Sequence, residues 1–319
     1  MPRVLDFGLG LMIALSACAP APDGAEVGES SAEFGESGES DASSSTGDGD
    51  GDGDGDGDGD GDGEGDGDGD GDGDGDGDGD GDGDGDGDGD PVEVPAVLFV
   101  GNSYTAFNDL PGLVAALGDG SATPLSTDSI TVGGARVVDH LANPEVVDAL
   151  AGDWDVVVIQ GQSVEPILDY PTFEQAVLDF AALSAMGGDA RVLLYQTWPR
   201  EAGNPDLAQL GMSVDEMYEG LASGYFEAAL ASDTEVAPVG DAWMSTLQLD
   251  PQDSLDLYAG DGSHPSLAGS YLAACVFFGK IVDQACSTSD YAPPELSAEE
   301  VEQLRLMADI TNDFIDPSP

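Results

Sequence analysis

Basic residues are scarce in this sequence. Its 319 residues include six Lys and Arg against 66 Asp and Glu, which gives a formal net charge of −60 at pH 7. Residues 91–319 alone hold five of these bases and 36 of the acids. Nucleic-acid binding requires clustered Lys and Arg to neutralise phosphates, so the composition argues against nucleic acid as a partner. A polyanionic substrate would be repelled for the same reason.

Histidine is scarcer still. His140 and His264 are the two histidines, so there are few candidates for a general base near neutral pH. His140 falls in an expected helix, where we interpret it as a partly exposed structural residue. The sequence also lacks a phosphate-binding loop, a run of metal ligands and a dinucleotide fingerprint. We therefore expect no metal site and no cofactor.

Three cysteines are present, and two of them, Cys275 and Cys286, lie in the C-terminal part. One straight helix between them would hold them about 16 Å apart, which is beyond bridging distance. They could pair in an oxidising compartment only if the helix ended near Gly279. The sequence leaves the paired and the unpaired states equally open.

The apolar run from Phe7 to Leu15 is too short to span a bilayer as a permanent helix. It ends in Leu15-Ser16-Ala17-Cys18, which resembles the lipobox of bacterial lipoproteins. We therefore expect residues 1–17 to be a signal peptide, with lipidation of Cys18 as the membrane anchor. The expected location is the bacterial cell envelope, at the outer membrane. The alternative is an ordinary signal peptide and a secreted protein.

Apolar side chains are absent from Gly47 to Asp90, where Gly alternates with an acid in 22 dipeptides. Such a segment has nothing to bury, and its charges repel one another, so we expect a disordered linker. It lacks the apolar position of calcium-binding repeats and is given no metal site. The acidic, Ser-rich residues 18–46 are expected to extend the tether, which leaves 91–319 as the folded domain.

From Pro91 onward, short β-branched runs alternate with helical patterns. The runs predict strands over 96–100, 129–132, 155–159 and 191–195, with 234–239 as a candidate fifth. Helices are expected over 110–117, 137–150 with a break at Pro144, 173–186, 214–231, 266–278 and 297–314. Continuous apolar strands in alternation with helices indicate an α/β fold. We expect a three-layer α/β/α sandwich around a mostly parallel, five-stranded sheet.

Two polar segments lie at opposite ends of this domain. Gly101-Asn102-Ser103 follows the first strand, and taken alone these residues also fit a plain turn. His264 lies in Asp261-Gly262-Ser263-His264-Pro265, just before a helix. An Asp three residues before a His can reach round a turn and orient the imidazole, as in a catalytic triad.

Four segments in order resemble the four blocks of the SGNH (GDSL-type) hydrolases. The first block is 101–103, the second Gly133-Gly134, the third 159–163 and the fourth 261–264. The resemblance covers residues 96 to about 282. It implies an α/β/α fold and metal-free hydrolysis of esters without a cofactor. A small acyl ester or an acylated glycan, such as a carbohydrate O-acetyl group, is the expected substrate because a tethered surface enzyme meets glycans.

The resemblance also implies roles for individual residues. Ser103 would be the nucleophile, His264 the general base and Asp261 the residue that holds His264. The backbone N–H groups of Ser103 and Gly134 would form part of an oxyanion hole, together with a side-chain donor from the third block.

The third block departs from the family's usual Gly-x-Asn, because Ser163 stands at the Asn position. A Gln amide offers the same N–H donor on a longer arm, so Gln162, or else Gln160, could replace it. The first block carries Asn102 in place of the usual Asp, which leaves the triad unchanged. A non-catalytic binding domain with this fold is the alternative that the missing Asn suggests.

Two further residues follow the fourth strand. Trp198 is a candidate for lining the acyl or sugar pocket, and packing in the core is an equally good interpretation. Arg200 could meet a substrate carboxylate, but a solvated loop position is the better interpretation. The sequence leaves the oligomeric state open.

Overall fold

The computed structural model describes residues 94–249 and 255–315. The expected signal peptide over 1–17, the lipidation site Cys18, the tether over 18–46 and the linker over 47–90 lie outside the described residues. Within the described ranges, no helix combines the length and the apolar character that crossing a membrane would need.

Five parallel strands form one sheet in the order β2-β1-β3-β4-β5. The strands are β1 (Ala96–Gly101), β2 (Ser126–Thr131), β3 (Val156–Ile159), β4 (Arg191–Tyr195) and β5 (Glu235–Ala237). The chain moves from β1 outward to β2 and then crosses to β3 on the other side of β1. Folds of this kind bind ligands where the strand order reverses, outside the carboxyl ends of the strands, which here are those of β1 and β3.

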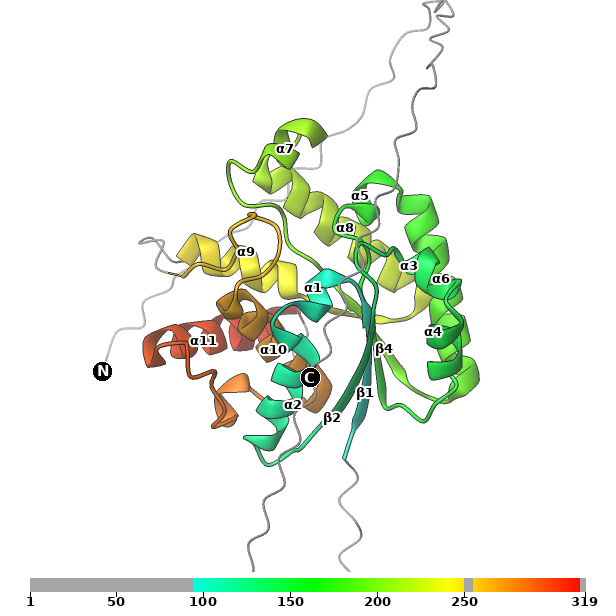
Figure 1. The fold of residues 1–319 in the computed structure, drawn as a ribbon, viewed down its shortest axis with the longest axis horizontal. Helices are drawn as coiled ribbons and strands as arrows, with labels where there is room; N and C mark the ends of the chain where they lie inside the picture. Colours follow the sequence, from blue (N-terminus) through cyan, green and yellow to red (C-terminus); the bar gives the residue numbers. More distant parts are fainter. Residues whose placement is uncertain (1–93, 250–254, 316–319) are drawn as a thin grey trace, which may run out of the picture. The chain divides into compact units, whose positions relative to one another are not determined.

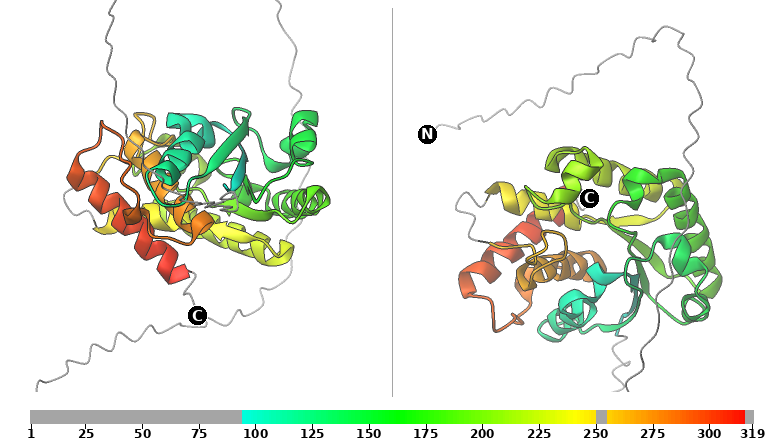
Figure 2. Two further views of the ribbon diagram at one scale, coloured as in Figure 1. Left: turned by 90° about the horizontal axis from the view of Figure 1, so that it is seen from below. Right: turned by 45° about the horizontal axis from the view of Figure 1, so that its top comes forward.

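Helices cover both faces of the sheet (Figure 1), as the sequence predicts. One face carries α2 (Leu110–Asp119), α9 (Val239–Leu249), α10 (Leu267–Val282) and α11 (Ala298–Ile315). The other carries α3 (Val137–Leu141), α4 (Pro144–Ala149), α6 (Tyr170–Gly187) and α8 (Val214–Ser232). In both views of Figure 2, the red helix α11 and the green helix α6 stay on opposite sides of the sheet. The predicted three-layer α/β/α fold is confirmed.

The core follows from alternation along β1. Val97 and Phe99 are buried against α2 and α10, while Leu98 and Val100 are buried against the helices on the other face. Successive side chains of a strand point to opposite faces, so a continuous apolar run fills both layers at once. This is why β1, β3 and β4 could be identified as strands from their apolar runs.

The edge strand β2 differs from its prediction. It runs from Ser126 to Thr131 and not from 129 to 132, and most of its residues are exposed. Its first half is the polar Ser126-Thr127-Asp128, which pairs with β1 through backbone hydrogen bonds. The start of β2 is defined by backbone pairing with β1 and not by burial of its side chains. A search for apolar runs therefore could not predict where this strand begins.

Short elements connect the larger ones near the carboxyl ends of the strands. They are α1 (Ser103–Ala106), η1 (Phe107–Asp109), α5 (Glu165–Leu168) and α7 (Pro205–Leu210), with η2 (Cys286–Thr288) after α10. Cys275 and Cys286 form a disulfide, with their Cα atoms 5.2 Å apart. Helix α10 continues past Gly279 to Val282, and Asp283 then adopts a left-handed conformation that reverses the chain.

Candidate active site

Ser103 lies directly after β1, at the first position of helix α1. Asn102 caps this helix, because its side-chain oxygen accepts a hydrogen bond from the Tyr104 N–H at 3.1 Å. The cap turns the chain sharply over the sheet edge and leaves Ser103 half-buried. Its hydroxyl can therefore be reached both from the protein and from solvent.

The structure brings Ser103, His264 and Asp261 together. His264 Nε2 lies 2.8 Å from Ser103 Oγ, and His264 Nδ1 lies 2.5 Å from Asp261 Oδ2. The other carboxylate oxygen of Asp261 accepts the backbone N–H groups of Ser263 and His264, both at 2.9 Å. A carboxylate at Nδ1 requires the proton there, which leaves Nε2 as the acceptor for the Ser103 hydroxyl.

The carboxyl group of Asp261 is held in its ionised form. Partial burial on its own would raise the pKa, but the hydrogen bond from the His264 ring and those from the His264 and Ser263 N–H groups outweigh it. Together they lower the pKa of Asp261 from 3.8 to about 2. An ionised Asp261 can stabilise positive charge on His264 over the whole neutral range.

Two aromatic rings enclose the His264 imidazole. Phe107 stacks on its face, with ring centroids 4.3 Å apart and an interplanar angle of 14°, while Tyr104 meets it edge-on at 5.4 Å. The Asn108 amide, next to Phe107, donates to Pro265 O at 3.2 Å, next to His264. Sequence reasoning missed Phe107 because no local signal connects it with a residue 157 positions away.

Asn102 joins the first three blocks. Its amide nitrogen donates to Ala135 O at 3.1 Å and to Gly161 O at 3.5 Å. Its oxygen accepts from Gln160 Nε2 at 2.9 Å as well as from the helix α1 backbone. Asp could accept these bonds but could not donate the other two, so the surroundings of this buried position fit Asn.

Gly134 lies in a turn closed by a 3.0 Å hydrogen bond from Ala135 N to Val132 O. Its φ of 69° places it in the left-handed region, which glycine adopts at little cost. Within residues 94–249 and 255–315, no acceptor meets the N–H groups of Gly134 and Ser103. Both are therefore available to an oxygen atom that enters the site.

Gln160 and Gln162, the two predicted side-chain donors of the third block, differ in their surroundings. Gln160 is fully buried, and its two amide hydrogens go to Asn102 Oδ1 at 2.9 Å and to Gly161 O at 2.7 Å. It has no hydrogen left for a substrate, which removes it as a candidate. Gln162 is half-buried and spends one amide hydrogen on Ser163 Oγ at 3.2 Å.

Trp198 does not line a pocket. Its side chain is 0% exposed and stacks between Tyr104, at 4.7 Å, and Trp243, at 4.0 Å. The candidate role in substrate binding is therefore wrong, since no surface of the ring is open to a ligand, and the alternative of packing in the core is confirmed. Its indole N–H donates to Ser263 O at 3.1 Å, so Trp198 helps to hold the fourth block in place from the protein core.

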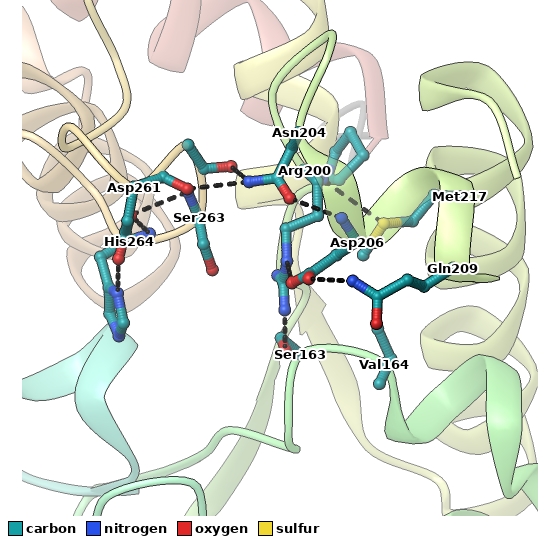
Figure 3. Close-up of polar contacts among 12 residues, drawn as sticks. Ser163, Val164, Arg200, Asn204, Asp206, Gln209, Met217, Asp261, Ser263 and His264 are labelled. Carbon is teal, nitrogen blue, oxygen red and sulfur yellow. Dashed lines mark hydrogen bonds and ion pairs between the residues drawn. The ribbon is translucent and has the colours of Figure 1, made fainter.

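Arg200 is buried, which corrects its interpretation as a solvated loop residue. Nη1 donates to Tyr104 Oη at 2.5 Å and Nη2 to Ser163 Oγ at 2.9 Å, while Nε lies 3.3 Å from Asp206 Oδ2. Figure 3 shows the guanidinium pointing at Ser163, with Asp261, Ser263 and His264 on the neighbouring loop. One cation thus links Tyr104, the residue after the first block, to Ser163 in the third block.

Two more titratable groups are buried behind the blocks. His140 is 1% exposed and not partly exposed, and burial lowers its pKa, which favours the neutral ring. Burial raises the pKa of Glu165, although Glu165 Oε2 accepts the N–H groups of Gln162 and Val137. In the described part of the chain, no three His, Cys, Asp or Glu side chains gather as metal ligands.

Comparisons with known proteins give matches among solved structures. No family model and no curated protein matches the chain. A DUF4886 family protein from Bacteroides uniformis superposes with a TM-score of 0.62 at 18% identity, over 71% of this chain and 97% of the other. A protein from Slackia heliotrinireducens, assigned to the SGNH hydrolases, is 34% identical. That match has a TM-score of 0.51 and covers 58% of this chain and 98% of the other.

Proposed function

The chain belongs to the SGNH hydrolases, and from this premise we propose that it is a serine esterase that cleaves small acyl esters. The observation that carries the proposal is the pair of hydrogen bonds from His264 to Ser103 and to Asp261. A nucleophile, a base and a group that orients the base are within hydrogen-bond reach of one another, which is the arrangement that activates a serine.

In the acylation step, Ser103 Oγ attacks the ester carbonyl carbon while His264 Nε2 takes the hydroxyl proton. The carbonyl oxygen becomes an oxyanion, which the N–H groups of Ser103 and Gly134 bind. The ionised Asp261 stabilises the imidazolium. When the tetrahedral intermediate collapses, the bond to the leaving oxygen breaks and the imidazolium gives its proton to that oxygen, so an alcohol leaves.

In the deacylation step, water repeats this sequence. His264 Nε2 takes a proton from the water as its oxygen attacks the acyl carbon, and the oxyanion again forms between the two N–H groups. Collapse returns the proton to Ser103 Oγ and releases the carboxylic acid. The chain's own residues supply every proton transfer in both steps.

We further propose that the acyl group is small and the substrate uncharged, with a carbohydrate O-acetyl group as the leading candidate. Residues 91–319 carry 36 acids against five bases, so anionic esters are repelled. Phe107 on His264 also occupies space beside the nucleophile. A domain tethered through Cys18 at the cell envelope would meet acylated glycans there.

The test is hydrolysis of p-nitrophenyl acetate by the purified chain and by its Ser103→Ala variant. We expect turnover by the wild type and a loss of at least about 10³-fold in the variant. Ser223→Ala is the matched control, because Ser223 is an exposed serine on α8, and it should retain full activity. Equal rates for wild type and Ser103→Ala would contradict the proposal and favour a non-catalytic binding domain with the SGNH fold.

A further inference from the structure

Residues 259–264 form the catalytic loop, which carries Asp261 and His264. A hydrogen bond from Ala259 N to His264 O, at 2.7 Å, joins the two ends of this loop. The Asp261 side chain is 51% exposed, so neighbouring side chains enclose it only in part. The position of its carboxylate therefore depends on where the backbone of the catalytic loop is held.

Three successive carbonyl oxygens of the catalytic loop accept hydrogen bonds from one segment, residues 198–204, which follows strand β4. These oxygens belong to Asp261, Gly262 and Ser263. The Trp198 indole and the Glu201 backbone N–H supply one donor each, at 3.1 and 2.9 Å. The other two donors are the amide hydrogens of Asn204.

Asn204 is the residue of this segment that reaches Asp261 itself. Its amide nitrogen donates to Asp261 O at 2.8 Å and to Gly262 O at 3.1 Å. Its side-chain oxygen accepts the Asp206 N–H at 2.9 Å and thereby caps α7. Figure 3 shows Asn204 between the loop with Asp261 and the helix with Asp206. Both amide hydrogens and the oxygen are in use, so these bonds fix the orientation of the side chain.

Gly262 makes the close approach of the two segments possible. Its φ of 63° lies in the left-handed region, which glycine adopts at little cost. A β-carbon at this position would lie 2.9 Å from Asn204 Nδ2 and 2.9 Å from Glu201 Oε2, which is too close for either atom. The catalytic loop and segment 198–204 therefore fit each other only because Gly262 has no side chain.

The same segment is bonded to the neighbour of the nucleophile. Arg200 Nη1 donates to Tyr104 Oη at 2.5 Å, and Tyr104 follows Ser103 in the chain. Segment 198–204 thus contacts both the element that carries Ser103 and the loop that carries His264. Catalytic groups need supports of this kind, because a small error in their relative position lowers the rate.

We propose that Asn204 is a positioning residue of the triad, which holds the catalytic loop so that Asp261 Oδ2 stays on His264 Nδ1. Without its two donated bonds, the loop can move away from segment 198–204, and water can replace His264 at the exposed carboxylate. A misplaced Asp261 no longer orients the imidazole, so proton transfer from the serine slows. The effect on turnover rests on the proposed function, whereas the effect on the hydrogen bond between His264 and Asp261 does not.

Asn204→Ser is the test variant, and Asn143→Ser is its matched control. Each Asn precedes a proline and caps a short helix with its side-chain oxygen, which accepts the Asp206 or the Glu145 N–H. Serine is an equally good cap, but its shorter side chain has one hydrogen and cannot reach both carbonyls. Asn204→Asp is a second variant, which keeps the shape and the cap but loses both donors.

The first measurement is proton NMR of the His264 Nδ1–H, whose signal is identified by its loss in His264→Ala. A proton held between a ring nitrogen and a carboxylate gives a downfield signal that exchanges slowly with water. We expect this signal in the wild type and in Asn143→Ser. In both Asn204 variants it should disappear or exchange at least about tenfold faster. A wild type without the signal, or an unchanged signal in Asn204→Ser, would overturn the proposal.

The second measurement is kcat and KM for p-nitrophenyl acetate. We expect both Asn204 variants to lower kcat at least about tenfold and to change KM less than about threefold, because Asp261 acts on the chemical step. Asn143→Ser should stay within about twofold of the wild type. A loss confined to Asn204→Asp would be an effect of the added charge, and equal losses in Asn204→Ser and the control would be an effect of the cap. Either result would overturn the positioning role.

The two measurements separate this inference from the proposed function. If the wild type is inactive and the Nδ1–H signal is lost only in the Asn204 variants, the esterase proposal fails and the positioning role stands. If the wild type is active and Asn204→Ser matches the control in both measurements, the inference alone is overturned. Thermal unfolding of each variant checks that the fold is intact.

Discussion

The Asn102 side chain makes four hydrogen bonds: three reach Ala135, beside the second block, and Gln160 and Gly161 in the third, and one caps helix α1. In Asn102→Asp, the amide donors are lost and a carboxylate faces the carbonyl oxygens of Ala135 and Gly161. We expect the free energy of unfolding at pH 7 to fall by about 2–3 kcal/mol. Urea unfolding measures this change.

Asn143→Asp is the matched control for that variant. Asn143 caps α4 with its side-chain oxygen alone, which accepts the Glu145 N–H at 3.0 Å. Asp can make the same bond, so the control should unfold at nearly the same urea concentration as the wild type. Equal stability of Asn102→Asp and the control would show that the two donated bonds contribute nothing.

Asp261 gives a prediction for pH. Its pKa in the folded protein, about 2, lies below the ordinary value of 3.8. A depressed pKa means that ionised Asp261 stabilises the fold above about pH 4 and that this contribution is lost as pH falls through 2. The melting temperatures of wild type and Asp261→Asn should therefore differ at pH 6 and converge toward pH 2. A gap that stays constant over this range would contradict the assignment.

At the residue scale, the sequence was sufficient to predict Ser103, His264 and Asp261. Histidine is scarce, and each of the two segments that carry these residues, 101–103 and 261–264, can be recognised from neighbouring residues alone. Sequence reasoning left Trp198 open between pocket lining and core packing and misplaced Arg200, since both side chains contact Tyr104, which is almost 100 positions earlier in the chain. It retained Gln160 as a donor because the partner that uses its amide, Asn102, is 58 positions away. Contacts of this kind leave no periodic signal in the sequence.

At the scale of elements, the η1 turn at 107–109 shapes the site. Asn108 and Asp109 have φ values of 54° and 53°, which non-glycine residues seldom adopt. The Asn108 amide stabilises this turn by donating to Pro265 O and to Ser270 Oγ, at 3.2 and 2.9 Å. The turn thereby holds Phe107 on the face of His264.

Phe107→Leu should lower kcat about two- to fivefold. The change keeps an apolar side chain but removes the ring face that stabilises the imidazolium formed in each step, a contribution of about 0.5–1 kcal/mol. Phe226→Leu is the control, because Phe226 is exposed on α8. Steady-state kinetics with p-nitrophenyl acetate compare the two. An unchanged kcat in Phe107→Leu would mean that the stacking has no catalytic effect.

Among the elements, burial decides which could be predicted. Strands β1, β3 and β4 are covered on both faces, so each appears in the sequence as a continuous apolar run. The long helices appear as apolar residues at helical spacing. The short helices α1, α5 and α7 have four to six residues each, too few for a periodic pattern. Asn102 caps α1 and Asn204 caps α7, while α5 has no side-chain cap, so no periodic pattern could predict the three helices.

At the scale of the whole molecule, the disulfide links Cys275, in the middle of α10, to Cys286, at the start of η2. It joins residues 11 positions apart, and reduction should lower the free energy of unfolding by about 3 kcal/mol. Urea unfolding with and without a reducing agent measures this. Because the bond lies away from the triad, kcat should not change, and a loss of activity on reduction of the folded protein would contradict this separation.

The tether is proposed as a spacer that takes no part in catalysis. Deletion of residues 47–90 should leave kcat for p-nitrophenyl acetate within about twofold of the full chain, while Cys18→Ser should move the protein from the membrane fraction to the soluble fraction. Activity assays and fractionation of expressing cells test the two parts. Loss of turnover on deletion would assign the acidic tract a direct role.

The central claim is that Ser103 is a nucleophile activated by His264 and Asp261. The most direct test is mass spectrometry of the intact protein and its peptides after treatment with a serine-directed phosphonate. We expect a single adduct on Ser103 in the wild type, none in Ser103→Ala, and strongly slowed labelling in His264→Ala. An unlabelled wild type, or an adduct on another serine, would contradict the account.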